Sequence, residues 1–404
     1  MVVERRNVIG WAIGFGCSQL GDQIFALAIA WAAIQAGSAA TVGLVIAAGS
    51  IPRIAILLFG GALADRVSAK LMIAIADALR ALTLLAFAIL LSGGLRSVLG
   101  LVTVSVLIGT ADGIFQPAVG ALSVRLGPQS QIPRVSALRT TVSRLCLLAG
   151  GPISGAALAW SGTKTAFAIA GVLFIGSVAA LALIRIGPAA IETSPTVAGQ
   201  SAQRSLLGEI LDGLRAVRRH PLLPWLLLLI GGLNVGFSGP MTAGIPLLAD
   251  ALDWGPGAAG LIYGAFGLGA GVAGLGLMFV GRMPRAGLSC LLSAAAVALA
   301  LGCFAISHHP IAGIVAGAVV GVAAGIFGTT ANGLVMASTP RAEIGRVMSL
   351  HALVLEGVVP VSLSLSGLLA AASSPSTVFA AGAGVLLLTL IVPAGRRGLR
   401  SARW

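Results

Sequence analysis

Long runs of apolar residues, separated by short polar stretches, extend over almost the whole chain. Each run is about 20 residues long, the length that an α-helix needs to cross the hydrocarbon core of a bilayer. The pattern predicts twelve membrane-spanning helices, with boundaries near residues 8–35, 40–62, 70–92, 97–121, 135–160, 164–185, 222–249, 257–280, 286–307, 310–337, 345–371 and 375–393. The fold class expected from this pattern is an all-α polytopic membrane protein.

One connection is much longer than the others and divides the predicted helices into two sets of six. This stretch, residues 186–221, carries apolar residues at helical spacing between basic ones, namely Leu207, Ile210, Leu211, Leu214 and Val217. Such a basic amphipathic helix is expected to lie on the membrane surface. The chain is therefore predicted to consist of an N-terminal half (1–185), a linker (186–221) and a C-terminal half with a short basic tail (222–404). Two six-helix halves with a binding site between them are a plan typical of secondary transporters.

Composition supports a membrane protein and excludes a soluble one. Of 404 residues, 57% are hydrophobic and only 9% are charged, whereas a soluble domain carries about 25% charged residues. A single tyrosine and few aromatic residues argue against an outer-membrane barrel with aromatic girdles. The 56 glycines fit helices that pack closely in lipid.

The net charge of +13 reflects topology and does not indicate binding to nucleic acid. Twenty of the 25 lysines and arginines fall on one side of the predicted membrane, in the termini, the linker and alternate loops. Two, Arg96 and Lys164, fall on the other side, and three lie within spans: Arg53, Arg80 and Arg144. Positive residues concentrate on the cytoplasmic side of membrane proteins. Both termini are therefore expected in the cytoplasm.

The loop "GALADRVSAK" after the second span resembles the signature loop of the major facilitator superfamily. Gly61, Asp65, Arg66 and Lys70 match that motif, and Ser68 stands where the family usually has glycine. The resemblance implies a fold of two six-helix pseudo-repeats and a conformational latch formed by these four residues. The stretch "GGPISGA" (150–156) resembles the family's Gly-Pro antiporter motif, but Leu147 and Leu148 occupy its upstream glycine positions.

Other stretches resemble the branch of drug and siderophore exporters that includes macrolide-efflux and enterobactin-export proteins. They are "SQLGDQIFALAIAW" (18–31), "IADALRALTLL" (75–85), "FQPAVGAL" (115–122), "LDGLRAVRRHPLLPWLLLL" (211–229) and "NGLVMASTPRAEIGRVMSLHAL" (332–353). The resemblance extends over nearly the full chain. It implies efflux of a small molecule by alternating access.

Two groups of charges within the spans are expected to pair. Asp112 on the fourth span and Arg144 on the fifth both lie ~13 Å from the cytoplasmic end, and a mainly structural ion pair between them is predicted. The alternative is that Asp112 and Arg144 carry the proton or bind substrate. Asp77 and Arg80 share one helix face at i, i+3 and, with Arg53, are expected to form a charge cluster. That cluster is expected to brace the signature loop; the alternative is a charged gate that substrate touches.

Two further acids are candidates for carrying a proton or binding substrate. Glu356 is the only acid within the spans of the second half and lies ~16 Å deep. Asp22 lies ~21 Å along the first span, a helix that lines the central cavity in the family, and no partner for it is evident in the sequence. The alternative for Asp22 is a packing hydrogen bond with Ser18, four residues earlier.

Together with these patterns, the resemblance implies a proton-coupled exporter of an amphipathic small molecule in the bacterial cytoplasmic membrane. An importer of the same fold and a lipid flippase are the alternatives. Clustered catalytic residues, metal-ligand spacing and nucleotide-binding loops are lacking in the sequence, so no enzyme, metal or cofactor is expected, and the proton gradient is the expected energy source. The expected partners are the substrate, protons and the lipid bilayer, with the protein a monomer.

Overall fold

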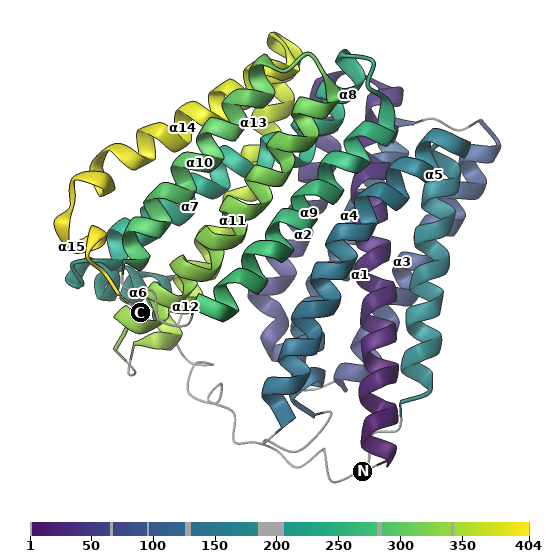
Figure 1. Cartoon of the computed structure of the whole chain (residues 1–404). Helices are drawn as coiled ribbons and strands as arrows, with labels where there is room; N and C mark the ends of the chain where they lie inside the picture. The colour runs from purple at the N-terminus through teal and green to yellow at the C-terminus, as the bar shows by residue number, and fades with distance from the viewer. Residues whose placement is uncertain are drawn as a thin grey trace.

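The computed structural model is built of helices throughout the part of the chain that it describes, residues 2–64, 68–94, 97–125, 131–184, 206–280, 285–340 and 343–403 (Figure 1). The first bundle contains α1 (Val2–Ala36), α2 (Ala39–Ala64), α3 (Ala69–Ser92), α4 (Val98–Arg125) and α5 (Ile132–Ala182). The second contains α7 (Leu223–Gly239), α8 (Ile245–Ala251), α9 (Gly255–Val280), α10 (Ala286–Ile306), α11 (Pro310–Ser338), α12 (Ile344–Gly357), α13 (Val359–Ala372) and α14 (Pro375–Gly395). Helix α6 (Leu206–Arg219) precedes the second bundle, and α15 (Arg397–Arg400) follows it.

Eleven helical segments are long and apolar enough to span a membrane within the described ranges. One of them, α5, has 51 residues, far more than one crossing requires. Gly162 interrupts it with φ 76°, a left-handed conformation that glycine adopts without the steric cost of a Cβ atom. The chain reverses there, so α5 supplies two antiparallel spans. The all-α class and the predicted spans are thus confirmed, with twelve crossings when α5 counts twice.

Two spans of the second bundle are interrupted within the membrane. Helix α7 continues through a π-helical turn, Pro240–Gly244, into α8. Helices α12 and α13 are separated at Val358, with Pro360 in the first turn of α13, where a proline lacks only an N–H that would be unpaired anyway. Broken helices of this kind occur in membrane proteins where the backbone is buried in protein or lines a cavity.

The two bundles meet through close backbone contacts of small residues. Helix α2 packs on α13, where a Cβ on Gly43 would lie 2.8 Å from the Cα of Gly367. Helix α5 packs on α9, where a Cβ on Gly155 would lie 3.0 Å from the Cα of Gly260. Both contacts lie at the same end of the molecule as the turn at Gly162. Figure 1 shows the bundles close together at that end and spreading apart toward the end that carries both chain termini.

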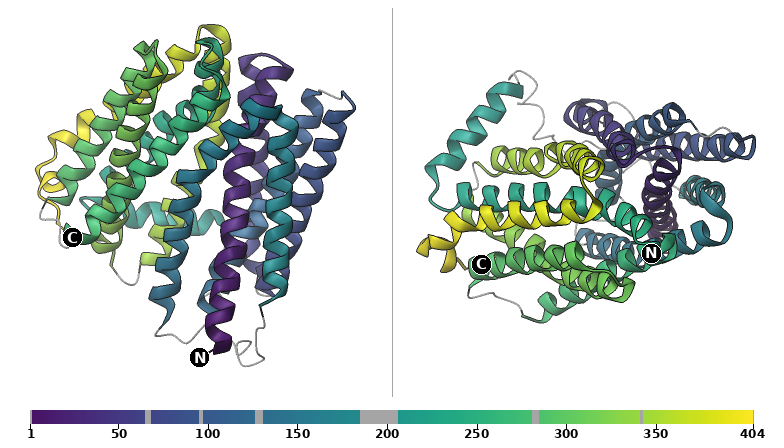
Figure 2. Two further views of the ribbon diagram at one scale, coloured as in Figure 1. Left: turned by 45° about the vertical axis from the view of Figure 1, so that its right-hand side comes forward. Right: turned by 90° about the horizontal axis from the view of Figure 1, so that it is seen from above.

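The amphipathic helix predicted within residues 186–221 is present as α6, and it packs on protein. A Cβ on Gly213 would lie 3.0 Å from the carbonyl oxygen of Arg346 on α12, and Ala216 and Val217 are buried. Seen from above, α6 lies at the periphery beside α12 (Figure 2, right). Its location at the membrane surface and the domain boundaries at 185 and 222 stay predictions.

Candidate functional site

The most unusual side chain in the first bundle is Arg80 on α3, because a cation is completely buried there (0% exposed). Its guanidinium carbon lies 4.3 Å from the ring centre of Phe115 on α4 and 5.2 Å from that of Phe174 on α5. Aromatic faces attract a cation through the ring quadrupole. These rings hold the guanidinium plane in place but cannot neutralise its charge.

Asp77 neutralises that charge from the same helix face, one turn earlier. Arg80 Nη1 donates to Asp77 Oδ1 at 2.9 Å. Ser18 on α1 donates to the same oxygen at 3.0 Å, and Ser177 on α5 donates to Asp77 Oδ2 at 2.6 Å. Asp77 is also fully buried (0% exposed). Its carboxylate therefore ties three helices together, and the predicted Asp77–Arg80 pair is confirmed.

Two more aspartates approach the same guanidinium from other helices. Asp112 on α4 accepts a hydrogen bond from Arg80 Nη2. Asp22 on α1 lies with Oδ1 3.8 Å from Arg80 Nη1, and this oxygen is buried without a hydrogen-bond partner. The side chains of Asp22 and Asp112 are each 22% exposed, unlike Asp77. We call Ser18, Asp22, Asp77, Arg80, Asp112 and Ser177 the Arg80 cluster.

The Arg80 cluster carries an excess of negative charge. Three carboxylates surround one guanidinium, which leaves two formal negative charges uncompensated if all are ionised. Uncompensated charge in a low-dielectric interior is costly. The cluster can lower that cost by taking up a proton or another cation, and Asp22, which makes no hydrogen bond, can do so without losing one.

Two of the pairings considered from the sequence are wrong. Asp112 pairs with Arg80, and Arg144 forms no ion pair with any acid that the structure describes. Helix α4 packs mainly on α2 and α3 and touches α5 little, so equal depth does not bring Asp112 to Arg144. Ser18 donates to Asp77 and not to Asp22. Asp22 has a cationic neighbour, Arg80, which a different helix supplies.

Contrary to the sequence-based expectation, Arg53 does not join Asp77 and Arg80. Its Nη2 lies 3.4 Å from Glu356 Oε2 on α12, so the pair connects the two bundles. The side chains are 35% and 42% exposed, respectively. Glu356, expected as a lone acid, is thus paired in this conformation.

Only part of the predicted latch can be located. Asp65 and Arg66 lie outside the described residues, and Gly61 falls in the last turns of α2. Lys70 Nζ donates to the carbonyl oxygen of Ile184 at 2.6 Å, beyond the end of α5. The latch role of these four residues stays a prediction.

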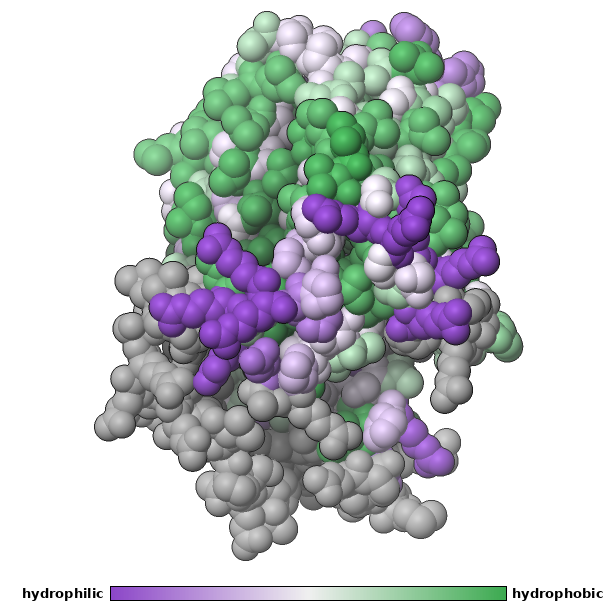
Figure 3. Space-filling view, turned by 90° about the vertical axis from the view of Figure 1, so that its left-hand side faces the viewer, coloured by the Kyte–Doolittle hydropathy of each residue, from purple (hydrophilic) through white to green (hydrophobic). Residues whose placement is uncertain are grey.

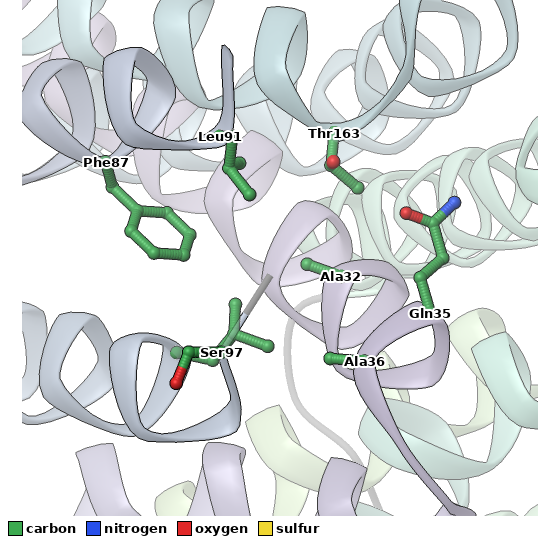
Figure 4. A pocket seen from close by; sticks show the side chains of 8 residues that line it. Ala32, Gln35, Ala36, Phe87, Leu91, Ser97 and Thr163 are labelled. Atoms are coloured by element: carbon green, nitrogen blue, oxygen red, sulfur yellow. The ribbon is translucent and has the colours of Figure 1, made fainter. Parts of the chain in front are cut away.

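A small pocket lies at the end of the first bundle where α5 turns at Gly162. Figure 4 shows its lining between α1, α3, α4 and α5, with Phe87, Gln35 and Thr163 among the residues. It has room for about one water molecule and no ionisable residue lines it. Among the described residues, no group of three or more potential metal ligands has a suitable arrangement. The Arg80 cluster is therefore the strongest candidate for a functional site.

Comparison with known proteins identifies one family whose model matches most of the chain. The family model described as Major Facilitator Superfamily matches residues 11–356 and 241–400. Among curated proteins, none matches the chain at a significant level.

Solved structures of low sequence identity share the fold. A bacterial homologue of the iron transporter ferroportin in an inward-facing state has a TM-score of 0.76 and 15% identity, over 97% of this chain and 98% of that one. The nucleoside transporter NupG has a TM-score of 0.73 and 14% identity, over 98% of both chains. The POT family transporter PepTSo has a TM-score of 0.70 and 14% identity, over 96% and 97%.

Proposed function

The chain belongs to the Major Facilitator Superfamily, and we propose that it is a proton-coupled exporter of an amphipathic small molecule. The observation that carries this proposal is the Arg80 cluster, in which three aspartates share one buried guanidinium. A secondary transporter couples two ligands through one site that each can occupy in turn. The cluster has more carboxylates than cations, and two of these carboxylates are partly exposed. Such a site can bind either a proton or a weakly cationic substrate.

Within the cluster the three acids differ in what they can do. Asp77 is held by Arg80, Ser18 and Ser177 and is closed to solvent, so it positions Arg80 and exchanges no proton. Asp22 and Asp112 are partly exposed. We assign Asp22 as the principal proton carrier because protonating it breaks no hydrogen bond. We assign Asp112 a different role: its hydrogen bond to Arg80 changes in strength as Asp22 loses or gains a proton.

Alternating access requires contacts between the bundles that form in one state and break in another. Arg53–Glu356 is such a contact, because its partners lie on α2 and α12. The bundles spread apart toward the end that carries the termini (Figure 1). If that end faces the cytoplasm, as the distribution of arginine predicts, this conformation is open inward. Glu356 would then be released from Arg53 when the protein turns outward, and could take up a proton there.

The proposed substrate follows from the few charges inside the protein and from the sequence resemblance. Apart from the Arg80 cluster, Arg144 and the Arg53–Glu356 pair, the spans are dominated by alanine, glycine, leucine and valine, which provide apolar contacts for a drug, antibiotic, siderophore or other metabolite. The resemblance to macrolide-efflux and enterobactin-export proteins favours export. We place the protein in the bacterial cytoplasmic membrane, as a monomer with both termini in the cytoplasm.

Everted membrane vesicles test coupling and direction together. Ethidium, a lipophilic cation, serves as the transported probe, and a pH gradient with an acidic lumen is imposed. We expect uptake that collapses with a protonophore and falls at least tenfold in Asp22→Asn and in Asp112→Asn, with abundance unchanged. Asp250→Asn, an exposed acid at the end of α8, is the matched control. Uptake by Asp22→Asn that still follows the pH gradient would overturn the assignment of Asp22.

The same preparation separates the alternatives. Gradient-driven accumulation in right-side-out vesicles, with none in everted ones, would identify an importer and contradict the proposed direction. Proteoliposomes with a fluorescent phospholipid test flippase activity, since movement of lipid without movement of any soluble probe would contradict the export of a small molecule.

A further inference from the structure

The C-terminal segment docks on the second bundle and does not extend away from it. Leu399 in α15 is fully buried (0% exposed). The N–H of Gly287, in the first turn of α10, donates to the carbonyl oxygen of Ala402 at 3.3 Å. These contacts hold the exposed side chains of Arg396, Arg397 and Arg400 at one place on the surface.

The C-terminal segment packs on the start of α7, which directly follows the basic end of α6. Gly398 adjoins Leu222, whose Cδ2 lies 3.8 Å from the position of a Cβ on that glycine. The guanidinium carbon of Arg396 lies 4.6 Å from the ring centre of Trp225. Arg218 and Arg219 end α6 only three to four residues before Leu222. Arginines from two distant parts of the chain thus flank one short stretch, Leu222–Trp225.

These arginines are free to bind an anion. Arg218, Arg219, Arg396 and Arg397 are exposed, and none of them pairs with an acid whose side chain the structure describes. The acids of α6 lie in its first half, before the basic turn. Figure 3 views this side of the molecule and shows hydrophilic residues gathered in a band below a hydrophobic surface.

The hydrophobic surface next to the arginines has the form that acyl chains require. On α14, Leu388, Ile391 and Val392 are 68%, 66% and 48% exposed. Ile391 precedes Arg396 by five residues, which is about 7.5 Å along a helix. This apolar strip ends at the arginines, and Trp225 lies at the boundary. The same order, from apolar to aromatic to basic, is found where the hydrocarbon core of a bilayer gives way to its headgroups.

We propose that this surface is a binding site for an anionic phospholipid. The phosphate of the headgroup lies between the arginines at the end of α6 and those around α15, and the acyl chains lie along α14. Guanidinium groups bind phosphate oxygens through paired N–H donors, and basic residues next to the membrane attract anionic lipids. A bound lipid joins the linker helix to the C-terminal segment through a shared ligand. This site is independent of the transported substrate.

The full-length protein in nanodiscs provides the test. Nanodiscs of phosphatidylcholine receive increasing fractions of phosphatidylglycerol, and quenching of tryptophan by a brominated form of that lipid measures binding. We expect quenching that saturates at a low mole fraction. The double variant Arg219→Gln/Arg396→Gln should weaken the apparent affinity at least fivefold, while Arg219→Lys/Arg396→Lys retains most of it. Arg6→Gln, an exposed arginine of the other bundle, is the matched control.

Two outcomes would overturn the proposal. Equal quenching by brominated phosphatidylcholine would indicate a general lipid surface without selection for charge. Displacement of the lipid by millimolar inorganic phosphate, or an affinity unchanged in the double glutamine variant, would mean that no site joins headgroup and acyl chains. Size-exclusion chromatography verifies that each variant is folded, and the lysine pair separates loss of charge from loss of structure.

Discussion

The carboxylate of Glu356 on α12 lies 3.4 Å from the guanidinium of Arg53 on α2, and so links the two bundles by charge. Both side chains are more than one third exposed, so solvent weakens their attraction. Exposed ion pairs contribute about 0.2–1 kcal/mol. A contact of this strength can bias a conformational equilibrium without locking it, as a reversible transport cycle requires.

Neutralising either partner should therefore shift the conformational populations by a modest factor. For Arg53→Gln or Glu356→Gln we expect the conformation described here to become about 1.4- to 5-fold less populated, the factor that 0.2–1 kcal/mol represents. Electron-spin distance measurements between a label on α4 and one on α11 would measure this change in population. The charge swap Arg53→Glu/Glu356→Arg should restore the distribution, and Lys164→Gln is the control. A swap that behaves like either single variant would show that charge pairing is not the cause.

The hydroxyl of Ser177 should matter for stability and not for coupling. It donates to the buried carboxylate of Asp77 at 2.6 Å, and its removal leaves that oxygen without a donor. We expect Ser177→Ala to lower the free energy of unfolding by about 1–2 kcal/mol, measured by denaturation in mixed micelles. The ratio of protons to substrate should stay unchanged. Thr165→Ala, at an exposed position on the same helix, should cost less, and a changed coupling ratio in Ser177→Ala would contradict the positioning role.

Most of the fold could be predicted because the chain marks its membrane crossings with apolar runs. Hydrophobicity sets where a span begins and ends, and charge sets its orientation. Neither signal reveals where the backbone of a span departs from regular α-helix. The π-helical turn at Pro240–Gly244 and the break at Val358 depend on packing between helices, so they were not predicted. The prolines at 240 and 360 are local signals of these irregularities.

The site was predicted less well because depth does not determine direction. Asp112 and Arg144 lie at similar depth, yet a helix has a full circle of faces, and Asp112 faces α3. The i, i+3 spacing of Asp77 and Arg80 did fix a shared face, and that pair is present. Ser18 was considered only as a partner of Asp22, whereas it donates to Asp77. Ser177 had no signal, since serines within apolar helices usually bond to their own backbone.

The geometry of Arg80 should be as important as its charge. One nitrogen donates to Asp77 and another to Asp112, an arrangement that a lysine cannot reproduce. We expect Arg80→Lys to fold and to lose at least tenfold in transport. Arg80→Met leaves buried carboxylates without a cation, which costs about 3–5 kcal/mol and should prevent accumulation of folded protein.

Fluorescence-detected size-exclusion chromatography checks these variants. Adding Asp77→Asn and Asp112→Asn to Arg80→Met removes two of the three uncompensated carboxylates and leaves Asp22, the proposed proton carrier, to be neutralised by a proton. Folded protein should then be restored without restoring transport. If Arg80→Met accumulates normally by itself, the cluster does not carry the charge balance that we infer.

The glycine contact between α2 and α13 should limit how closely the bundles approach. In Gly43→Ala the new methyl group would lie 2.8 Å from Gly367 Cα and 2.9 Å from the Leu363 carbonyl oxygen, so the helices must separate. We expect faster reaction of a thiol introduced at Ala39 with a membrane-impermeant maleimide, together with slower transport. Gly271→Ala, where a Cβ meets nothing within 4 Å, is the control. Unchanged thiol reactivity would indicate that the contact is not a closing point.

The hydroxyl of Tyr263 should stabilise the π-helical turn. It donates to the carbonyl oxygen of Met241 at 2.7 Å and also approaches that of Thr242 at 3.2 Å, two carbonyls within the segment whose α-helical bonding is disturbed. Tyr263→Phe keeps the ring and removes the donor. We expect a loss of about 0.6–1.7 kcal/mol in the free energy of unfolding and faster amide hydrogen exchange confined to residues 240–245. Trp160→Phe, at a side chain that is 91% exposed, should change neither. Exchange that rises evenly along α7 would indicate a general loss of packing and contradict a local role for the hydroxyl.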